Sequence, residues 1–228
     1  MKPLVLIPGF MCDDRLFEPQ IRALSELSAI TVAIPKEKII HDMAAEILAQ
    51  TSGQFALGGL SMGGIIALEI LRQAPDRITH LALMDTTPLA DAPANYDIRT
   101  RQIADVHAGR LGTIMRDELK PAYLVESPRK KGILDTCMDM ARSLGTDIFE
   151  AQSLALRDRP DLQSALARAP AKTLILYGAK DRLCTPERHH LMHRLAPHAR
   201  LVKIADAGHM PTLERPEETT RALQDWLA

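Results

Sequence analysis

Six short apolar runs, bounded by proline, glycine and aspartate residues, are the feature of this sequence that most constrains its fold. Such runs are typical of strands that are buried on both faces, as in a parallel sheet. A piece of buried helix would look similar, but the flanking breakers favour strands. The runs cover residues 4–7, 30–34, 55–60, 81–84, 173–177 and 201–204, of which the second and third are weaker.

Helical patterns separate these runs. Asp42 and Thr185 are candidate N-caps, and Pro186 stands at a first helical position. Strand and helix therefore alternate, which predicts an α/β protein with right-handed crossovers and a twisted sheet covered on both sides. The helical patterns lie at 17–27, 43–48, 63–71 and 186–195 and in a C-terminal segment that begins at Pro216.

One long stretch, residues 88–169, breaks the alternation. It contains no convincing strand, so we interpret it as a helical insertion after the fourth strand, and such insertions often cover sites. The chain then divides into a core, residues 1–87 and 170–228, and a helical cap, residues 88–169. Helices are expected in the cap at 97–108, 131–143, 147–157 and 161–168.

The composition is that of a globular protein and excludes several classes. The 228 residues are 46% apolar and carry a formal net charge of −1, so we expect no nucleic-acid partner and no pull towards an anionic membrane. No signal-peptide core or transmembrane segment is evident, and the three scattered cysteines argue against a disulfide framework. These features predict a cytoplasmic protein and leave the oligomeric state open, a homodimer included.

The segment that carries chemistry is G-L-S-M-G, residues 59–63, between a strand and a helix. This G-x-S-x-G pattern is the nucleophile elbow, in which a strained turn lifts the serine hydroxyl above the sheet edge. Side chains at Gly59 and Gly63 would collide with neighbouring backbone. The alternative is a glycine-rich turn with an inert serine, but the flanking strand and helix favour Ser61 as a nucleophile.

A serine nucleophile needs a base and an orienting acid, which follow an elbow in the order acid, then histidine. Asp181 and His209 come just after the fifth and sixth strands, at the edge where catalytic groups of parallel sheets gather. Asp85, after the fourth strand, competes with Asp181 for the role of acid. His189 and His193 have the spacing of a metal pair, but no further ligand completes a set, so we expect no metal and no cofactor.

An oxyanion hole needs two backbone N–H donors. One is expected from Met62, directly after the nucleophile, and the other from Phe10, in the loop after the first strand, where Gly9 lets the chain turn inward. Phe10 could instead be a core residue under the sheet. Cys12 lies close by without a visible base of its own, and we interpret it as a bystander.

Three segments together resemble the α/β-hydrolase superfamily, in particular single-domain serine carboxylesterases with a helical cap: G-L-S-M-G-G, Y-G-A-K-D and A-G-H-M-P-T-L-E-R-P-E. The resemblance implies a reduced, mostly parallel sheet of about six strands in the order 2-1-3-4-5-6. The chain departs from the pattern in three ways. No β-hairpin precedes the oxyanion strand, Pro8 replaces the usual histidine before Gly9, and the usual glycine-rich turn after the second strand is missing.

The resemblance implies a serine hydrolase that cleaves a small or medium carboxylic ester, a small-molecule acyl substrate, through an acyl-enzyme. A thioesterase, a lactonase or a carbon–carbon bond hydrolase would use the same machinery. A different class, a ligand sensor or partner-binding protein with slow or no turnover, could use the same scaffold. An apolar substrate lining is expected from the insertion, with ordinary cap packing as the alternative, at Leu111, Met115, Leu124, Met138, Met140, Leu144, Phe149 and Leu154.

Overall fold

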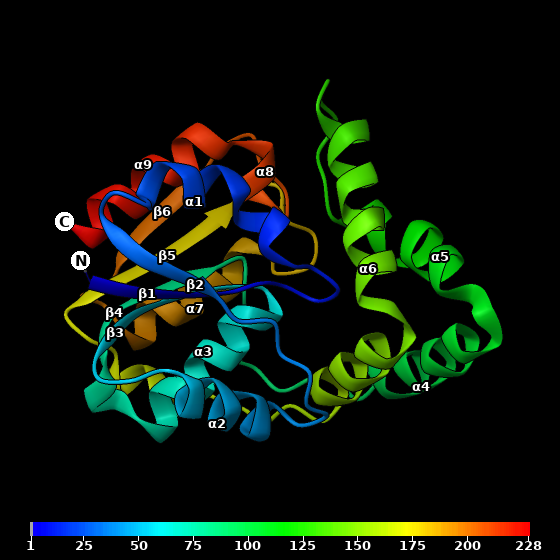
Figure 1. Cartoon of the computed structure of the whole chain (residues 1–228), viewed down its shortest axis with the longest axis horizontal. Coiled ribbons are helices and arrows are strands. Elements are labelled where there is room, and N and C mark those ends of the chain that lie inside the picture. The colour runs from blue at the N-terminus through cyan, green and yellow to red at the C-terminus, as the bar shows by residue number, and fades with distance from the viewer. Residues whose placement is uncertain (1) are drawn as a thin grey trace.

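The computed structural model describes residues 2–228 and is built on one six-stranded sheet (Figure 1). The strand order is β2-β1-β3-β4-β5-β6, and all neighbouring strands are parallel. All six predicted strands and their predicted order are confirmed. The strands are β1 (Lys2–Ile7), β2 (Ser28–Val32), β3 (Phe55–Leu60), β4 (Ile78–Met84), β5 (Lys172–Gly178) and β6 (Arg200–Ile204).

Alternation along β1 shows how the two faces of the sheet are filled. Leu4 and Leu6 belong to one hydrophobic cluster, with residues of α1 (Glu18–Leu24) and α9 (Pro216–Leu227). Val5 and Ile7 belong to a second cluster, with residues of α2 (Ile40–Gln50) and α3 (Met62–Gln73). Because successive side chains of a strand point to opposite faces, one short apolar run serves both cores. Figure 1 shows the corresponding layers, with α1 and α9 on one side of the sheet and α2, α3 and α7 (Pro186–Leu195) on the other.

The helices of the core follow the predicted alternation. Thr185 is the N-cap residue of α7, with Pro186 at the first helical position, as predicted. The prediction for Asp42 is wrong, because α2 begins at Ile40 and Asp42 lies inside its first turn. The core helices are η1 (Asp14–Phe17), α1 (Glu18–Leu24), α2 (Ile40–Gln50), α3 (Met62–Gln73), η2 (Pro75–Arg77), α7 (Pro186–Leu195), α8 (Pro211–Glu214) and α9 (Pro216–Leu227).

The chain between β4 and β5 is helical, and Figure 1 shows α4, α5 and α6 together at one end of the sheet. α6 is interrupted at Gly145, whose φ of 79° separates the two helices that the sequence predicts there. Although α6 is 28 residues long, neither it nor any other helix within residues 2–228 could cross a membrane. The elements are α4 (Asn95–Asp105), η3 (Val106–Arg110), α5 (Leu111–Thr113), η4 (Ile114–Leu119), η5 (Lys120–Ala122), α6 (Lys130–Arg157) and η6 (Gln163–Arg168).

Candidate active site

Ser61 lies at the sharp turn between β3 and α3. Its backbone has φ 56° and ψ −116°, a conformation that costs a non-glycine residue about 1–3 kcal/mol. The end of β4 holds the turn in place: the Ser61 N–H donates to the Met84 carbonyl at 2.9 Å, and the Thr86 hydroxyl donates to the Ser61 carbonyl at 2.7 Å. The strain predicted for an elbow is therefore present and is supported from the neighbouring strand.

Two glycines allow close packing at the turn, Gly59 against the start of α3 and Gly63 against the end of β1. A Cβ atom at Gly59 would lie 2.2 Å from the Gly63 carbonyl oxygen, and one at Gly63 would lie 1.9 Å from the Ile7 carbonyl oxygen. Both neighbours are backbone atoms, which cannot move aside by changing rotamer. The prediction that side chains at these two positions would collide with backbone is confirmed.

His209 lies between Ser61 and Asp181. Its Nε2 atom is 2.9 Å from Ser61 Oγ, and its Nδ1 atom is 2.7 Å from Asp181 Oδ2. Residue 209 follows β6 and residue 181 follows β5, so the carboxyl ends of three strands bring together groups that are 28 and 148 residues apart in the sequence. With Nδ1–H donating to the carboxylate, Nε2 is free to accept the serine proton.

The two aspartates that competed for the role of acid have different environments. Burial raises the pKa of Asp181, but the His209 imidazole and the N–H groups of Leu183 and Cys184 outweigh it, so the net pKa is lowered. Burial, and then the charge of Asp181, raise the pKa of Asp85 well above its ordinary value. Asp85 Oδ1 accepts one hydrogen bond, from the Gly178 N–H at 2.8 Å, and Oδ2 has no hydrogen-bond partner among residues 2–228. The geometry therefore leaves the negative charge on Asp181.

The loop that carries His209 is fixed by residues that the sequence analysis did not identify. The His209 N–H donates to the Tyr123 carbonyl at 2.7 Å, and the Tyr123 ring meets the imidazole edge-on. The buried Glu214 carboxylate accepts from the N–H groups of Val125 at 2.8 Å, Gly208 at 2.9 Å and Met210 at 3.1 Å. The insertion and the histidine loop are thus held together at the site.

The loop after β1 brings Phe10 to the same place. Met11, with φ 54°, donates its N–H to Gln152 Oε1 of α6 at 2.8 Å, and this long-range contact shapes the loop. Neither the Phe10 N–H nor the Met62 N–H forms a hydrogen bond within residues 2–228. Both expected oxyanion donors are therefore available. The Phe10 ring is also buried, edge-on to Phe149 at 5.1 Å, so the core interpretation of its side chain holds as well.

A pocket of about 360 Å³ opens on Ser61 and His209. Its apolar wall comes from Phe10 and Ile65 of the core and from Leu119, among others, of the insertion. The insertion thus supplies part of the apolar lining, as expected, but the residues named for it are wrong, because none of the eight lines this pocket. Several of them instead pack inside the insertion and against the sheet, as Phe149 does.

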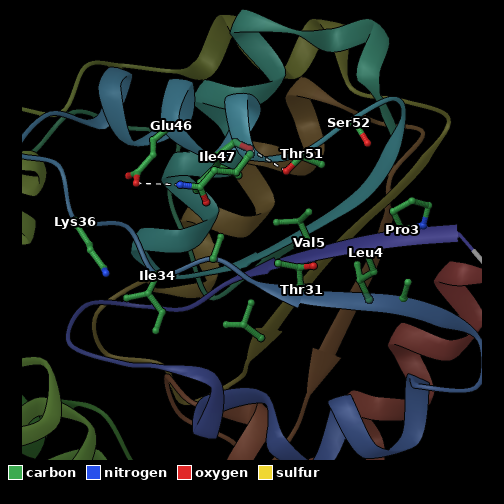
Figure 2. Close-up of a pocket in the computed structure, with 14 residues that line it drawn as sticks. Pro3, Leu4, Val5, Thr31, Ile34, Lys36, Glu46, Ile47, Thr51 and Ser52 are labelled. Carbon is green, nitrogen blue, oxygen red and sulfur yellow. Dashed lines mark hydrogen bonds between the residues drawn. The ribbon is translucent and has the colours of Figure 1, made fainter.

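A larger hollow, of about 560 Å³, lies between α2 and the strands β1 and β2, and neither Ser61 nor His209 lines it (Figure 2). Two of its polar side chains already have partners: the Thr51 hydroxyl donates to the Ile47 carbonyl at 2.8 Å, and Gln50 Nε2 donates to Glu46 Oε1 at 3.1 Å. No histidine or cysteine lines it. Size alone therefore does not make this hollow the site.

A cluster of side-chain atoms of the kind that bind metal ions lies at the active site itself. Among residues 2–228, only Asp181, Cys184 and His209 bring three such atoms within 4.8 Å of one another. The carboxylate and imidazole already bind each other, and burial strongly raises the pKa of the Cys184 thiol, which disfavours the thiolate that a metal needs. His189 is engaged too, because its Nε2 accepts the Thr86 N–H at 3.2 Å. Burial likewise raises the pKa of Cys12 to about 12, which suits a bystander.

Comparison with known proteins adds family information. The model of a protein family described as "Alpha/beta hydrolase family" matches residues 25–222. A pimeloyl-[acyl-carrier protein] methyl ester esterase of Neisseria meningitidis serogroup B is 26% identical over 243 residues, which cover 100% of this chain and 93% of the relative. The protein of the same name from Xanthomonas oryzae pv. oryzae is 27% identical, covering 99% of this chain and 94% of the relative.

Solved structures agree with the fold. A thermophilic esterase from Thermogutta terrifontis superposes with a TM-score of 0.89 at 30% identity, covering 100% of this chain and 89% of the other. The enol-lactonase from Burkholderia xenovorans LB400 superposes with a TM-score of 0.87 at 19% identity, covering 100% and 92%. At 19% identity the second likeness concerns the fold alone.

Proposed function

The chain belongs to the alpha/beta hydrolase family, and we propose that it cleaves small or medium carboxylic esters through an acyl-enzyme on Ser61, with His209 as base and Asp181 as orienting acid. It is a hydrolase acting on ester bonds, as its esterase relatives indicate. The serine, rather than an aspartate, at the elbow favours acyl transfer to the hydroxyl over alkyl transfer to a carboxylate.

The proposed reaction has two halves. Ser61 Oγ attacks the ester carbonyl while His209 Nε2 accepts its proton and then passes it to the departing alcohol, leaving an acyl ester on Ser61. Water, deprotonated by the same nitrogen, attacks this ester and releases the acid. In both halves two N–H groups stabilise the negative charge on the carbonyl oxygen. One belongs to Phe10, in the loop after β1, and the other to Met62, at the N-terminus of α3.

The single observation that carries the proposal is the chain of two short hydrogen bonds through His209, 2.9 Å to Ser61 and 2.7 Å to Asp181. Both distances lie within the range that direct proton transfer requires. His209 and Asp181 are buried, so this arrangement operates out of bulk water, where electrostatic effects are stronger.

The size of the pocket supports a small or medium ester. A volume of about 360 Å³ falls at the lower end of the range for small-molecule sites. We assign residues 1–87 and 170–228 to the catalytic core and residues 88–169 to a cap over the pocket, because Leu119, Tyr123 and Arg159 of this stretch line it. The cytoplasmic location belongs to the same proposal, whereas the oligomeric state, a homodimer included, stays open.

Replacement of the nucleophile tests the proposal. Ser61→Ala should lower kcat for p-nitrophenyl acetate and butyrate by about 10⁴- to 10⁶-fold, because it removes the attacking atom. The exposed Ser52, in the hollow beside β2, offers the matched control, and Ser52→Ala should keep wild-type turnover. Circular dichroism checks that both variants fold.

Covalent labelling separates an enzyme from a slow ligand sensor. A fluorophosphonate probe should modify wild type at Ser61, identified by peptide mass spectrometry, and should leave Ser61→Ala unlabelled. A folded Ser61→Ala variant with wild-type turnover would overturn the proposal. Absence of both labelling and turnover in wild type would favour the non-catalytic alternative.

A further inference from the structure

The pocket that opens on Ser61 has a strongly charged wall. Part of this wall comes from the insertion and part from α7. Charged groups are rare in pockets for simple apolar esters, whose walls are mostly hydrophobic with a few placed polar groups. The charged residues that line it are Asp91, Arg99, Glu118, Arg159 and Arg188.

Asp91 compensates part of the positive charge. Its Oδ2 atom is 2.7 Å from Arg99 Nε, and its Oδ1 atom is 3.0 Å from Arg159 Nη2. Arg159 also donates to the carbonyls of Leu89 at 3.0 Å and Leu156 at 3.2 Å, so it has a structural role. One carboxylate is thus shared by two guanidinium groups.

Glu118 does not neutralise the remaining positive charge of the wall. Its carboxylate accepts hydrogen bonds from both Nη atoms of Arg101, at 3.0 and 2.5 Å, and from Gln102 Nε2 at 3.0 Å. Arg101 does not line the pocket. The charge of Glu118 is therefore balanced by a cation outside the pocket.

Arg188 is the unpaired group. It lies half-buried in the first turn of α7, where the helix dipole disfavours a cation, and it makes no hydrogen bond or ion pair through its side chain within residues 2–228. The adjacent Glu187 is exposed and does not line the pocket. Burial lowers the pKa of Arg159, the charge of Asp91 opposes this, and the charges of Arg99 and Arg188 lower it further, in keeping with the three arginines that line this wall.

We propose that this wall binds a carboxylate of the substrate, so that the enzyme prefers esters that carry a second, ionised carboxyl group. The inference rests on the ester hydrolysis proposed above and names the substrate class of the same site. Arg188 would donate two parallel hydrogen bonds to the carboxylate, a geometry for which guanidinium is suited, and the excess positive charge of the wall would be neutralised. Apolar groups of Leu119 and Leu183 also line the pocket and would pack against the connecting methylenes.

The carboxylate could belong to the acyl part or to the alcohol part of the ester, and two sets of substrates distinguish these. The first set contains monomethyl esters of four- to seven-carbon dicarboxylic acids. The second contains acetyl esters of hydroxy acids. Each is compared with its neutral carboxamide analogue, and kcat/KM is measured by titration of the acid released. In at least one set the charged substrate should be preferred by about tenfold to hundredfold, as expected for charge-assisted hydrogen bonds.

Variants assign the preference to Arg188. In Arg188→Met the ratio of kcat/KM for charged over neutral substrate should fall to about one. Arg188→Lys should keep an intermediate ratio, because a lysine supplies charge without the planar fork. Arg194 is on the same helix, exposed and outside the pocket, so Arg194→Met should keep the wild-type ratio.

Two results would overturn the inference. One is wild-type enzyme that hydrolyses charged and neutral esters equally in both sets; the other is a preference that survives intact in Arg188→Met. Failure of the proposed function itself would look different, because turnover would then be absent for every ester or would persist in Ser61→Ala.

Discussion

The contact between α3 and β1 can be tested by adding a single methyl group. At Gly63 the new Cβ atom would lie 1.9 Å from the Ile7 carbonyl oxygen, 2.6 Å from the Ile7 carbonyl carbon and 2.8 Å from the Pro8 carbonyl oxygen. All three are backbone atoms of the segment where β1 passes into the oxyanion loop. In Gly63→Ala either the N-terminus of α3 or this segment must move.

The loss of stability in Gly63→Ala depends on which neighbouring atoms can move aside. Overpacking a core costs about 1–3 kcal/mol when side chains can adjust. Here the obstacle is backbone, so we expect Gly63→Ala to lower the free energy of unfolding by about 3 kcal/mol or more. Activity should also fall, because the same segment carries Gly9, where a Cβ would be 3.3 Å from Ser61 Cβ.

A second glycine provides a control substitution that should raise the free energy of unfolding rather than lower it. Gly132 lies exposed in α6, and a Cβ atom there would have no neighbour within 4 Å. Gly132→Ala should raise the free energy of unfolding by about 0.5–1 kcal/mol, because alanine loses less backbone entropy in a helix. Urea unfolding followed by circular dichroism measures both variants. A Gly63→Ala variant as stable as Gly132→Ala would refute the packing argument.

The remaining predictions concern charged and titratable groups. Asp181→Asn should lower kcat by about 10⁴-fold, whereas Asp85→Asn should keep most activity, and initial rates on p-nitrophenyl butyrate separate the two. Burial lowers the pKa of His189 from 6.5 to about 4, so between these values the unfolded chain binds a proton that the folded chain does not. Stability should therefore be lost as pH falls through this window, by up to about 3 kcal/mol, and urea unfolding at pH 7 and 4.5 should show a smaller loss in His189→Gln. Glu214→Ala leaves three N–H groups unpaired, two of them buried, and should cost at least about 2 kcal/mol, whereas Glu214→Gln, which keeps one acceptor oxygen, should lose less in the same assay.

Local signals were sufficient for the sheet but not for the insertion. A strand buried on both faces needs a continuous apolar run, so 172–178 and the other strands could be located to within a few residues. The insertion contains the short helical segments η3, η4 and η5, which have no periodic apolar pattern, and of these only the first residues of η3 fall within a predicted helix, 97–108. The break at Gly145 was foreseen because it separates two periodic segments, whereas α5, at Leu111–Thr113, is too short to show a period.

The supporting contacts of the site could not be predicted, because they connect distant parts of the chain. Gln152 binds the Met11 N–H across 141 residues, and nothing near residue 152 marks it as part of an oxyanion loop. The charged pocket wall has a similar origin. The apolar residues named from the insertion were expected to face substrate, but several of them form its packing contacts, and Leu119 lines the pocket together with charged residues such as Arg99 of the insertion and Arg188 of α7.

The choice between Asp85 and Asp181 shows what the missing information was. Both residues follow neighbouring strands, so their local patterns are equivalent and both carboxyls reach the same edge of the sheet. Two neighbouring buried carboxylates do not both ionise readily, because their negative charges repel each other, so the charge stays where more donors meet it. The turn after β5 supplies two N–H groups to Asp181 in addition to His209, whereas Asp85 receives one N–H and has an oxygen without a partner in the described part of the chain. The conformation of one turn, rather than position in the sequence, therefore decides which aspartate can orient the histidine.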